Sequence, residues 1–247
     1  MRRNIVSKTP SRKGLITQAV ILAGGRGSRL APFSHALPKP LMPVGDTPII
    51  ELVVRRLAKA GVRDIIVAVG AGAKLIELFL GDGSAFGVRI RYARERSPLG
   101  TVGPLRRMVG LHKSFFVLNG DILTDLPFIK MARAHGLSGA ELTIGACERK
   151  ETTLYGVIES RAGRVVAYHE KPVRRFQVSM GVYVFTRSVL KEIPKGRFDF
   201  PDLVRRLLDQ NRPPHLFSHS GAWFDIGRPD DWLTADKAYR KNSARFS

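Results

Sequence analysis

Residues 18–30 read Gln-Ala-Val-Ile-Leu-Ala-Gly-Gly-Arg-Gly-Ser-Arg-Leu, and this stretch decides the fold class. Ala19 to Ala23 form a short, uniformly apolar run that ends in glycines, which is typical of a strand buried on both faces. Glycines after such a strand let backbone N–H groups approach phosphate oxygens closely. The stretch therefore predicts a parallel sheet with an anion-binding turn at the carboxyl end of its first strand.

Strands and helices alternate after this run, which is typical of a mainly parallel sheet covered on both faces. In the first half we expect strands over 64–69, 88–92 and 115–118, and helices over 48–60, 75–80, 101–109 and 128–134. Thr47 is expected to cap the first of these helices. In the second half we expect strands over 142–144, 155–158, 165–168 and 181–185, and helices over 201–208 and 229–239. The predicted fold is α/β, a Rossmann-like, mixed, mainly parallel sheet flanked by helices, in one domain with an elaborated C-terminal half.

The net charge of the chain points to a polyanionic partner. Among 247 residues, 41 Lys and Arg face 21 Asp and Glu, a formal charge of +20. A solvated basic surface explains such an excess equally well. The single cysteine, Cys147, excludes an intramolecular disulfide framework and a Cys-based metal cluster. No apolar run approaches the roughly 20 residues that span a bilayer, so we expect a soluble, cytoplasmic protein without a membrane span.

The basic residues are distributed unevenly along the chain. No acidic residue precedes Asp46, whereas eight basic residues do. We predict a flexible basic extension over residues 1–17, a single domain over residues 18–240 and a basic tail over residues 241–247. A transit peptide is the alternative for the extension, which lacks the apolar core of a secretory signal.

The glycine-rich segment matches neither common phosphate-binding fingerprint. A P-loop needs Lys directly after its last Gly, and the dinucleotide fingerprint needs Gly where Leu30 stands. Arg29 and Lys39, the latter in Pro38-Lys39-Pro40, add cationic phosphate donors with no acidic residue nearby. A tight strand-to-helix connection is the alternative for the glycines alone.

Two aspartates are candidate metal ligands. Asp121 follows the strand expected over 115–118, and Asp225 lies in Trp223-Phe224-Asp225-Ile226-Gly227. Two carboxylates and a triphosphate would satisfy much of a Mg²⁺ coordination sphere. A turn or helix-cap Asp is the alternative for each residue alone, and a separation of more than 100 residues does not show that they meet.

Several separated motifs together resemble the sugar-1-phosphate nucleotidyltransferases, the nucleotide-sugar pyrophosphorylases. The motifs are Ala23 to Leu30, Pro38 to Val44, Pro98-Leu99-Gly100-Thr101, Asn119-Gly120-Asp121, Tyr155-Gly156-Val157, Glu170-Lys171-Pro172 and Trp223 to Gly227. The resemblance covers about residues 18–239 and is strongest to the bacterial mannose-1-phosphate or heptose-1-phosphate guanylyltransferase-like branch.

The resemblance implies a reaction and a set of site residues. A nucleoside triphosphate, with GTP favoured over a thymidylyl or uridylyl donor, binds first, and a sugar 1-phosphate then displaces pyrophosphate. Nucleotide contacts are implied for Leu22, Ala23, Gly24, Gly25, Gly27, Pro98, Gly100 and Thr101. Catalytic roles are implied for Arg29, Lys39 and Lys171, and sugar-phosphate contacts for Gly156, Glu170, Lys171 and Ser179. Asp121 and Asp225 are implied to hold Mg²⁺, the expected cofactor.

One departure from the family pattern concerns the sugar. Ser179 stands where the family usually has Asn, and its hydroxyl is shorter than the amide that helps to hold sugar hydroxyls. A regulatory, catalytically silent binding subunit is the second interpretation of the chain. An RNA-binding protein, the third, rests on charge alone, so nucleic acid is not an expected partner. A homo-oligomer is left open.

Overall fold

The computed structural model describes residues 16–25, 27, 30, 37–70, 72–95 and 97–246. The first apolar run forms β1 (Gln18–Ala23), which pairs in parallel with β4 (Asp64–Val69) on one side and β6 (Ser114–Asn119) on the other. β5 (Arg89–Arg94) pairs in parallel with β4 and forms that edge of the sheet. The carboxyl ends of these strands therefore lie along one edge of the sheet.

The second half of the chain extends the sheet with strands of mixed direction. β11 (Val173–Thr186) runs antiparallel to β6 and to β8 (Leu142–Thr152), and β12 (His215–His219) pairs with β8 in parallel. The sheet has the order β12-β8-β11-β6-β1-β4-β5, and four of its six neighbouring pairs are parallel. The predicted mixed, mainly parallel α/β fold is confirmed.

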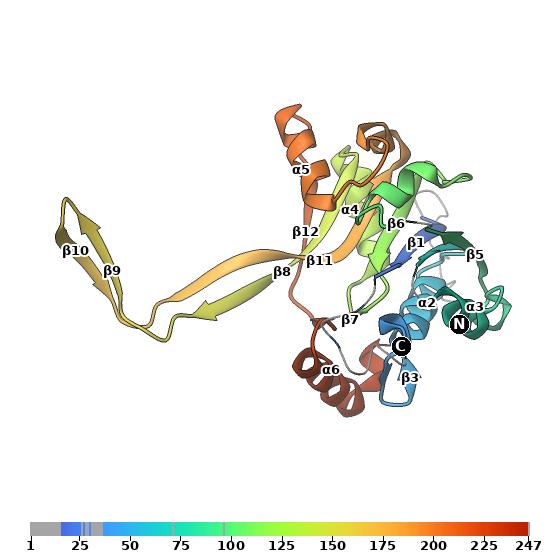
Figure 1. Ribbon diagram of the computed structural model, residues 1–247, viewed down its shortest axis with the longest axis horizontal. Helices are drawn as coiled ribbons and strands as arrows, with labels where there is room; N and C mark the ends of the chain where they lie inside the picture. The colour runs from blue at the N-terminus through green and yellow to red at the C-terminus, as the bar shows by residue number, and fades with distance from the viewer. Residues whose placement is uncertain are drawn as a thin grey trace, which may run out of the picture.

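Helices cover both faces of this sheet (Figure 1). The helices are α2 (Ile49–Lys59), α3 (Ala73–Leu80), α4 (Phe128–Ser138), α5 (Phe200–Asp209) and α6 (Pro229–Lys241). Short 3-10 turns are η2 (Lys39–Leu41), η3 (Ser84–Phe86), η4 (Gly103–Arg107), η5 (Arg187–Glu192) and η6 (Ser243–Phe246). Successive β1 side chains point to opposite faces, so Ile21 belongs to the core cluster that includes residues of α2, α3, α4 and α6, whereas Val20 belongs to the cluster that includes residues of η4, η5 and α5.

Two helix predictions need correction. Thr47 does not cap α2, because Thr47 and Pro48 form the two-residue strand β3 (Thr47–Pro48), which pairs with β2 (Pro43–Val44), and Pro48 is the cap residue. The helix expected over 101–109 is only the short turn η4. Gly103 and Pro104 both disfavour a regular α-helix at this position, which explains the difference.

The strands β8 and β11 are much longer than the sequence predicts. Beyond a register shift, they pair continuously from Ser179↔Ala146 to Val173↔Thr152, and β9 (Val157–Arg161) and β10 (Arg164–His169) then form a hairpin. We call residues 148–178 the arm; Figure 1 shows it projecting from the body of the molecule. β9 and β10 overlap the strands predicted over 155–158 and 165–168. The extensions of β8 and β11 were not predicted, because neither face of that ribbon packs on a core.

The predicted basic tail is packed onto the body through η6. Phe246 is buried, and its ring lies 6.3 Å from that of Phe224 and 6.2 Å from that of Tyr239. The predicted extension falls almost entirely on residues 1–15, outside the described residues, and Ile16 is already part of the core. No helix in the described part of the chain has the length and apolar character needed to cross a membrane.

Candidate functional site

Three predicted site residues from distant parts of the sequence meet at the carboxyl edge of the sheet. Lys39 extends from η2, and its Nζ contacts Oδ2 of Asp121 and lies 3.9 Å from Oδ1 of Asp225. Asp121 directly precedes β7 (Ile122–Thr124), and Asp225 ends β13 (Trp223–Asp225). These two strands are antiparallel, and the amide of Ile226 donates to the carbonyl of Asp121 at 3.1 Å. We call Lys39, Asp121 and Asp225 the body cluster.

Two charged side chains of the body cluster are largely buried, and the third, a carboxylate, is half exposed to solvent. The side chains of Lys39 and Asp121 are only 12% and 18% exposed, whereas that of Asp225 is 50% exposed. Charges withdrawn from water need a partner of opposite sign, and Lys39 supplies it to both carboxylates. The cluster is therefore held together by its own charges and stays accessible from the side of Asp225.

The donor set of the body cluster fits Mg²⁺ and does not form an all-protein metal cage. Among the described residues there is no group of three or more His, Cys, Asp or Glu side chains that could enclose a metal ion. Mg²⁺ is commonly held by one or two carboxylates, with the remaining positions filled by water and substrate phosphates. Asp121 and Asp225 match that mode of binding.

The glycine-rich turn lies beside the body cluster. Gly120, which precedes Asp121, donates its amide to the carbonyl of Leu22 at 2.9 Å, so β6 and β1 deliver the two segments to the same place. A Cβ atom at Gly70 would lie 2.7 Å from the carbonyl oxygen of Gly24, whereas one at Gly25 would meet no atom of the described residues within 4 Å. Gly24 thus packs against the end of β4, and the backbone at Gly25 is open to a ligand.

The remaining residues of this turn are described only in part. Ala23 is buried at the end of β1, and Gly27 has a φ of 64°, a left-handed conformation that favours glycine. The amide of Leu30 donates to the carbonyl of Gly27 at 2.8 Å, which closes the turn. Arg29 lies outside the described residues, so its role in binding phosphate stays a prediction.

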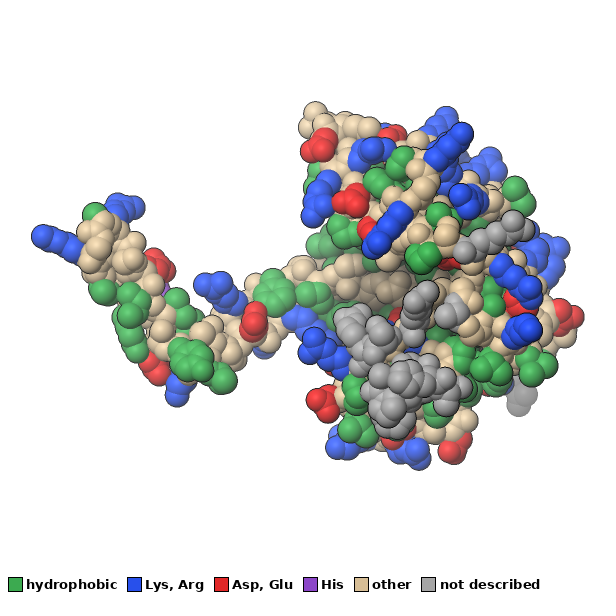
Figure 2. Space-filling model, viewed as in Figure 1, with side chains coloured by type: hydrophobic (Ala, Val, Ile, Leu, Met, Phe, Trp, Pro, Cys, Tyr) green, Lys and Arg blue, Asp and Glu red, His purple; other side chains and the backbone are tan. Residues whose placement is uncertain are grey.

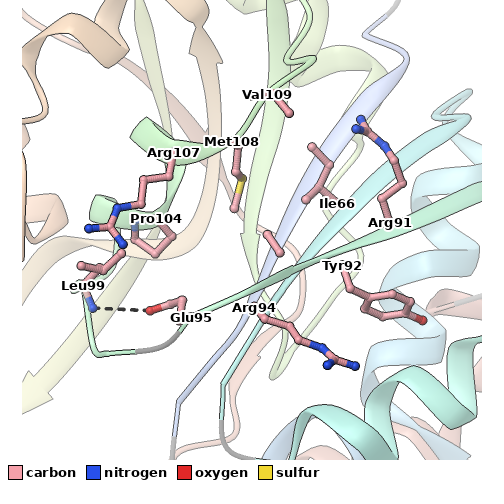
Figure 3. A pocket seen from close by; sticks show the side chains of 11 residues that line it. Ile66, Arg91, Tyr92, Arg94, Glu95, Leu99, Pro104, Arg107, Met108 and Val109 are labelled. Carbon is pink, nitrogen blue, oxygen red and sulfur yellow. Dashed lines mark hydrogen bonds between the residues drawn. The ribbon is translucent and has the colours of Figure 1, made fainter.

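Glu95 is a site residue that the sequence interpretation missed. It follows β5, and its amide donates to the carbonyl of Val69 at 3.0 Å. A Cβ atom at Gly24 would lie 3.0 Å from Oε1 of Glu95, and the amide of Leu99 donates to Oε2 at 3.4 Å (Figure 3). Burial raises the pKa of the Glu95 carboxyl, and the Leu99 hydrogen bond only partly offsets this effect. The signal in the sequence was the position of Glu95, one residue after a strand that ends at the carboxyl edge of the sheet, where the body cluster lies.

A pocket of about 270 Å³ adjoins Glu95 between β5 and η4 (Figure 3). Its lining includes Leu99 from the predicted nucleotide-binding loop, Pro104 from η4, Met108 directly after η4 and Ala93 from β5. Three arginines, Arg91, Arg94 and Arg107, also line the pocket, and Glu95 supplies its one carboxylate. A carboxylate beside apolar side chains is suited to a flat ring that presents N–H donors, and the arginines are suited to phosphate oxygens.

The loop from Pro98 to Thr101 is fastened to the start of α5. Gly100 has a φ of 79°, and a Cβ atom there would lie 2.6 Å from the carbonyl oxygen of Phe198. The Thr101 amide donates to Oδ1 of Asp199 at 3.0 Å, and the Thr101 hydroxyl accepts from the amide of Phe200 at 2.7 Å. Thr101 therefore holds the loop in place in this structure, while its contact with nucleotide stays a prediction, as do those of Gly100 and the exposed Pro98.

Ser179 lies at the base of the arm, on the side of the body. Its hydroxyl is 3.0 Å from that of Tyr183, whose ring stacks on Phe200 with centroids 3.9 Å apart. Burial raises the pKa of Tyr183, the hydrogen bond with Ser179 opposes this shift, and the negative charge of Asp225 adds to it. The Ser179–Tyr183 pair is thus within electrostatic influence of the body cluster.

The other predicted sugar-phosphate residues meet one another, but on the arm. A Cβ atom at Gly156 would collide with the hydroxyl of Tyr168, which itself donates to Oε2 of Glu170 at 3.0 Å. Nζ of Lys171 lies 3.9 Å from Oε1 of Glu170. We call Gly156, Tyr168, Glu170 and Lys171 the arm cluster. The structure does not bring it to the body cluster, because the arm projects away from the sheet (Figure 1).

Comparison with known proteins places the chain in a family. The family model described as nucleotidyl transferase matches residues 18–242. The chain belongs to the nucleotidyl transferase family. The resemblance that the motifs indicated is confirmed at this level.

Relatives of this nucleotidyl transferase include mannose-1-phosphate guanyltransferases of fungi. The chain is 36% identical to that of Aspergillus fumigatus over 238 residues, which cover 92% of this chain and 65% of the relative. It is 34% identical to that of Schizosaccharomyces pombe, with 90% of this chain and 64% of the relative covered. The chain therefore spans slightly less than two thirds of the length of these curated relatives.

Solved structures support the same fold. HddC from Yersinia pseudotuberculosis aligns with a TM-score of 0.70 at 25% identity, covering 91% of this chain and all of that one. A UDP-glucose pyrophosphorylase solved with UDP-glucose aligns with a TM-score of 0.69 at 19% identity, covering 92% of this chain and 99% of that one. The second likeness concerns the fold alone.

A further residue of this nucleotidyl transferase escaped the sequence interpretation. Cζ of Arg149 lies 4.8 Å above the ring of Trp223, and its Nη2 donates to the carbonyl of Trp223 at 3.3 Å. This contact braces the strand that carries Asp225, and no motif in the sequence indicates it. Cys147 is buried, and burial raises the pKa of its thiol.

Proposed function

We propose that this protein transfers a guanylyl group from GTP to a sugar 1-phosphate, which yields a nucleotide-sugar and pyrophosphate. The observation that carries the proposal is the body cluster, where one ammonium group lies between two carboxylates beside a glycine-rich turn. Relatives named mannose-1-phosphate guanyltransferases make mannose 1-phosphate the first sugar to test.

The proposed reaction needs no nucleophile from the protein. A phosphate oxygen of the sugar 1-phosphate forms a bond to the α-phosphorus of GTP. The bond from that phosphorus to the oxygen that bridges to the β-phosphorus breaks, and pyrophosphate leaves with the electron pair. Catalysis then consists of positioning two anionic substrates in line and of neutralising the charge that develops on their phosphate oxygens.

The residues of the body cluster and of the glycine-rich turn would have different roles in this reaction. Asp121 and Asp225 would hold Mg²⁺, which when bound neutralises charge on the nucleotide phosphates. Lys39 would exchange its contact with Asp121 for a phosphate oxygen near the reacting centre. Gly24, Gly25 and Gly27 would offer backbone N–H groups to the phosphates, and Arg29 would neutralise the leaving pyrophosphate.

We assign the choice of guanine to Glu95. Guanine presents N1–H and N2–H₂ as adjacent donors, and the two oxygens of a carboxylate accept such a pair. Glu95 is partly buried, adjoins both the glycine-rich turn and the pocket beside Leu99, and is the one acidic side chain that lines this pocket. Adenine, which carries an acceptor at N1, would leave one carboxylate oxygen unpaired, and this costs binding energy.

The remaining assignments complete the proposal. Gly156, Glu170, Lys171 and Ser179 would receive the sugar phosphate, with Lys171 on its phosphate and Glu170 on a hydroxyl. Residues 18–240 would form the catalytic domain, which would act in the cytoplasm.

The test is pyrophosphate release by the purified protein with Mg²⁺. GTP, dTTP, UTP, CTP and ATP are each combined with mannose, glucose, hexosamine and heptose 1-phosphates. Turnover confined to GTP and one sugar is the expected result. Turnover with another base would overturn the role of Glu95, and the absence of turnover with every pair despite GTP binding would replace catalysis by a binding role.

A further inference from the structure

The arm exposes apolar side chains that nothing in the described chain covers. From residue 148 to residue 179 no side chain is buried. Eight large apolar side chains of the arm are exposed: Leu154, Tyr155, Ile158, Val165, Val166, Tyr168, Val173 and Phe176. Figure 2 shows hydrophobic side chains gathered along the arm. An apolar surface of this extent marks an interaction site on a folded protein.

The hairpin at the end of the arm has one apolar and one polar face. Ile158 pairs with Tyr168 across the two strands, and both are about 60% exposed. Glu159, the next residue along β9, points to the opposite face, where its Oε1 lies 3.1 Å from Nε2 of His169. A two-stranded hairpin is at best marginally stable alone in water, so its apolar face needs a partner.

The arm cluster lies at the edge of this apolar face. Tyr168 belongs to the face and holds the carboxylate of Glu170 through its hydroxyl. The following residue, Lys171, has a φ of 43°, a conformation that L-residues other than Asn and Asp rarely adopt. Whatever covers the apolar face therefore also meets the carboxylate and the ammonium group of the arm cluster.

The arm directs this cluster away from its own body. Seven consecutive pairs hold β11 to β8, from Ser179↔Ala146 to Val173↔Thr152. At about 3.4 Å per residue, the six steps between them carry the chain about 20 Å beyond Ser179. A return to its own body cluster would require this paired ribbon to bend back on itself.

We propose that the arm of one chain docks on the body of a second copy of this chain and completes the substrate site there. Glu170 and Lys171 of one chain would then face the body cluster of the partner subunit, and the exchange would be reciprocal. This inference rests on the proposed function, because it joins the two halves of the predicted site. The occupant is a second copy because the body of this same chain carries the half-site that the arm cluster lacks.

The exposed area agrees with a dimer of this kind. Eight side chains that each expose about 100 Å² give about 800 Å² for one arm. Each docked arm also covers a comparable area of the partner subunit, about 1,600 Å² in total, which is typical of a stable, specific interface, and reciprocal docking doubles it to about 3,200 Å², within the range of obligate homodimers. Two-fold symmetry gives each dimer two complete sites.

The first test is complementation between two inactive variants. Asp121→Asn disables the body cluster and Lys171→Ala disables the arm cluster. The two chains are co-expressed with different tags and purified through both, so that every dimer contains one of each. One of the two sites then has both halves intact, and we expect about half of the wild-type turnover per dimer. Turnover no higher than that of the separate variants, with an active wild type, would show that each arm serves its own body.

The second test does not depend on activity. Light scattering should give the wild type a mass of two chains and Ile158→Asp, on the apolar face, a mass of one chain. Arg161→Asp introduces the same residue on the polar face of the same strand and should leave the dimer intact. A wild type with the mass of one chain at every concentration would overturn the docking. A dimer that Ile158→Asp separates, without turnover with any substrate pair, would retain the docking and remove the proposed function.

Discussion

Lys39→Met removes the positive charge of the body cluster and keeps a side chain of similar length. Lys39 is 12% exposed, so an effective dielectric constant of about 20 applies to its interactions. A unit charge about 4 Å from the negative charge that develops on a phosphate oxygen is then worth about 4 kcal/mol. Because about 1.4 kcal/mol corresponds to a factor of ten in rate, kcat should fall about 10³-fold.

The assay is pyrophosphate release at saturating GTP, sugar 1-phosphate and Mg²⁺. Lys130→Met, the same change at an exposed position on α4, is the matched control and should keep the wild-type rate. Lys39→Arg should lose less activity than Lys39→Met, because it retains the charge. Asp121 loses its partner in Lys39→Met, and we expect about 1–3 kcal/mol of destabilisation, which thermal unfolding measures. A folded Lys39→Met protein with a rate within tenfold of the wild type would refute the role of this charge.

Three further predictions concern metal use, base choice and stability. Asp225→Asn should raise the Mg²⁺ concentration for half-maximal turnover at least about tenfold, as expected for a lost carboxylate ligand, and an unchanged Mg²⁺ titration would contradict this role. Wild-type protein should prefer GTP to ITP, which lacks the 2-amino group, and Glu95→Gln should reduce that preference about 10- to 100-fold, the value of one charged hydrogen bond; equal ratios in kcat/KM for the two proteins would remove Glu95 from base recognition. Arg245→Ala should cost about 1–2 kcal/mol in urea unfolding, because Arg245 and His219 bind Asp125. Burial alone would raise the pKa of Asp125, but these two partners outweigh it and lower the pKa. The stabilisation is therefore present above about pH 4, where an unfolded Asp is ionised, and is lost as the pH falls through the lower folded pKa. A difference between Arg245→Ala and wild type that persists unchanged at pH 2–3 would contradict this assignment.

Local sequence patterns were sufficient for much of the sheet. The strand expected over 64–69 has the predicted bounds, and the helix expected over 48–60 differs from α2 by one residue at each end. Uniform apolar runs and capping glycines are local signals, so they survive in any tertiary context. The strands expected over 155–158 and 165–168 overlap β9 and β10 of the arm. The long extensions of β8 and β11 had no such signal, because this part of the ribbon packs on no core and needs no apolar period.

The candidate site, like the sheet, was predictable from the sequence only in part. Its chemistry was readable from the sequence, because phosphate binding needs glycines and cations and Mg²⁺ needs carboxylates, and these residues stand directly after apolar strands. Glu95 stands in the same kind of position but belongs to no motif that the sequence interpretation used. Its importance became visible only when Gly24 and Leu99 were found against its carboxylate.

The sequence by itself determined the α/β class, the family and the residue types of the site. These follow from short-range patterns and from motifs of a few residues each. Only the tertiary structure decided that Lys39, Asp121 and Asp225 meet, because strand pairing joins segments that lie more than 80 residues apart in the chain. It also decided that Glu170 and Lys171 lie apart from them, since the direction of a paired ribbon is set by its register and length, which no local pattern encodes.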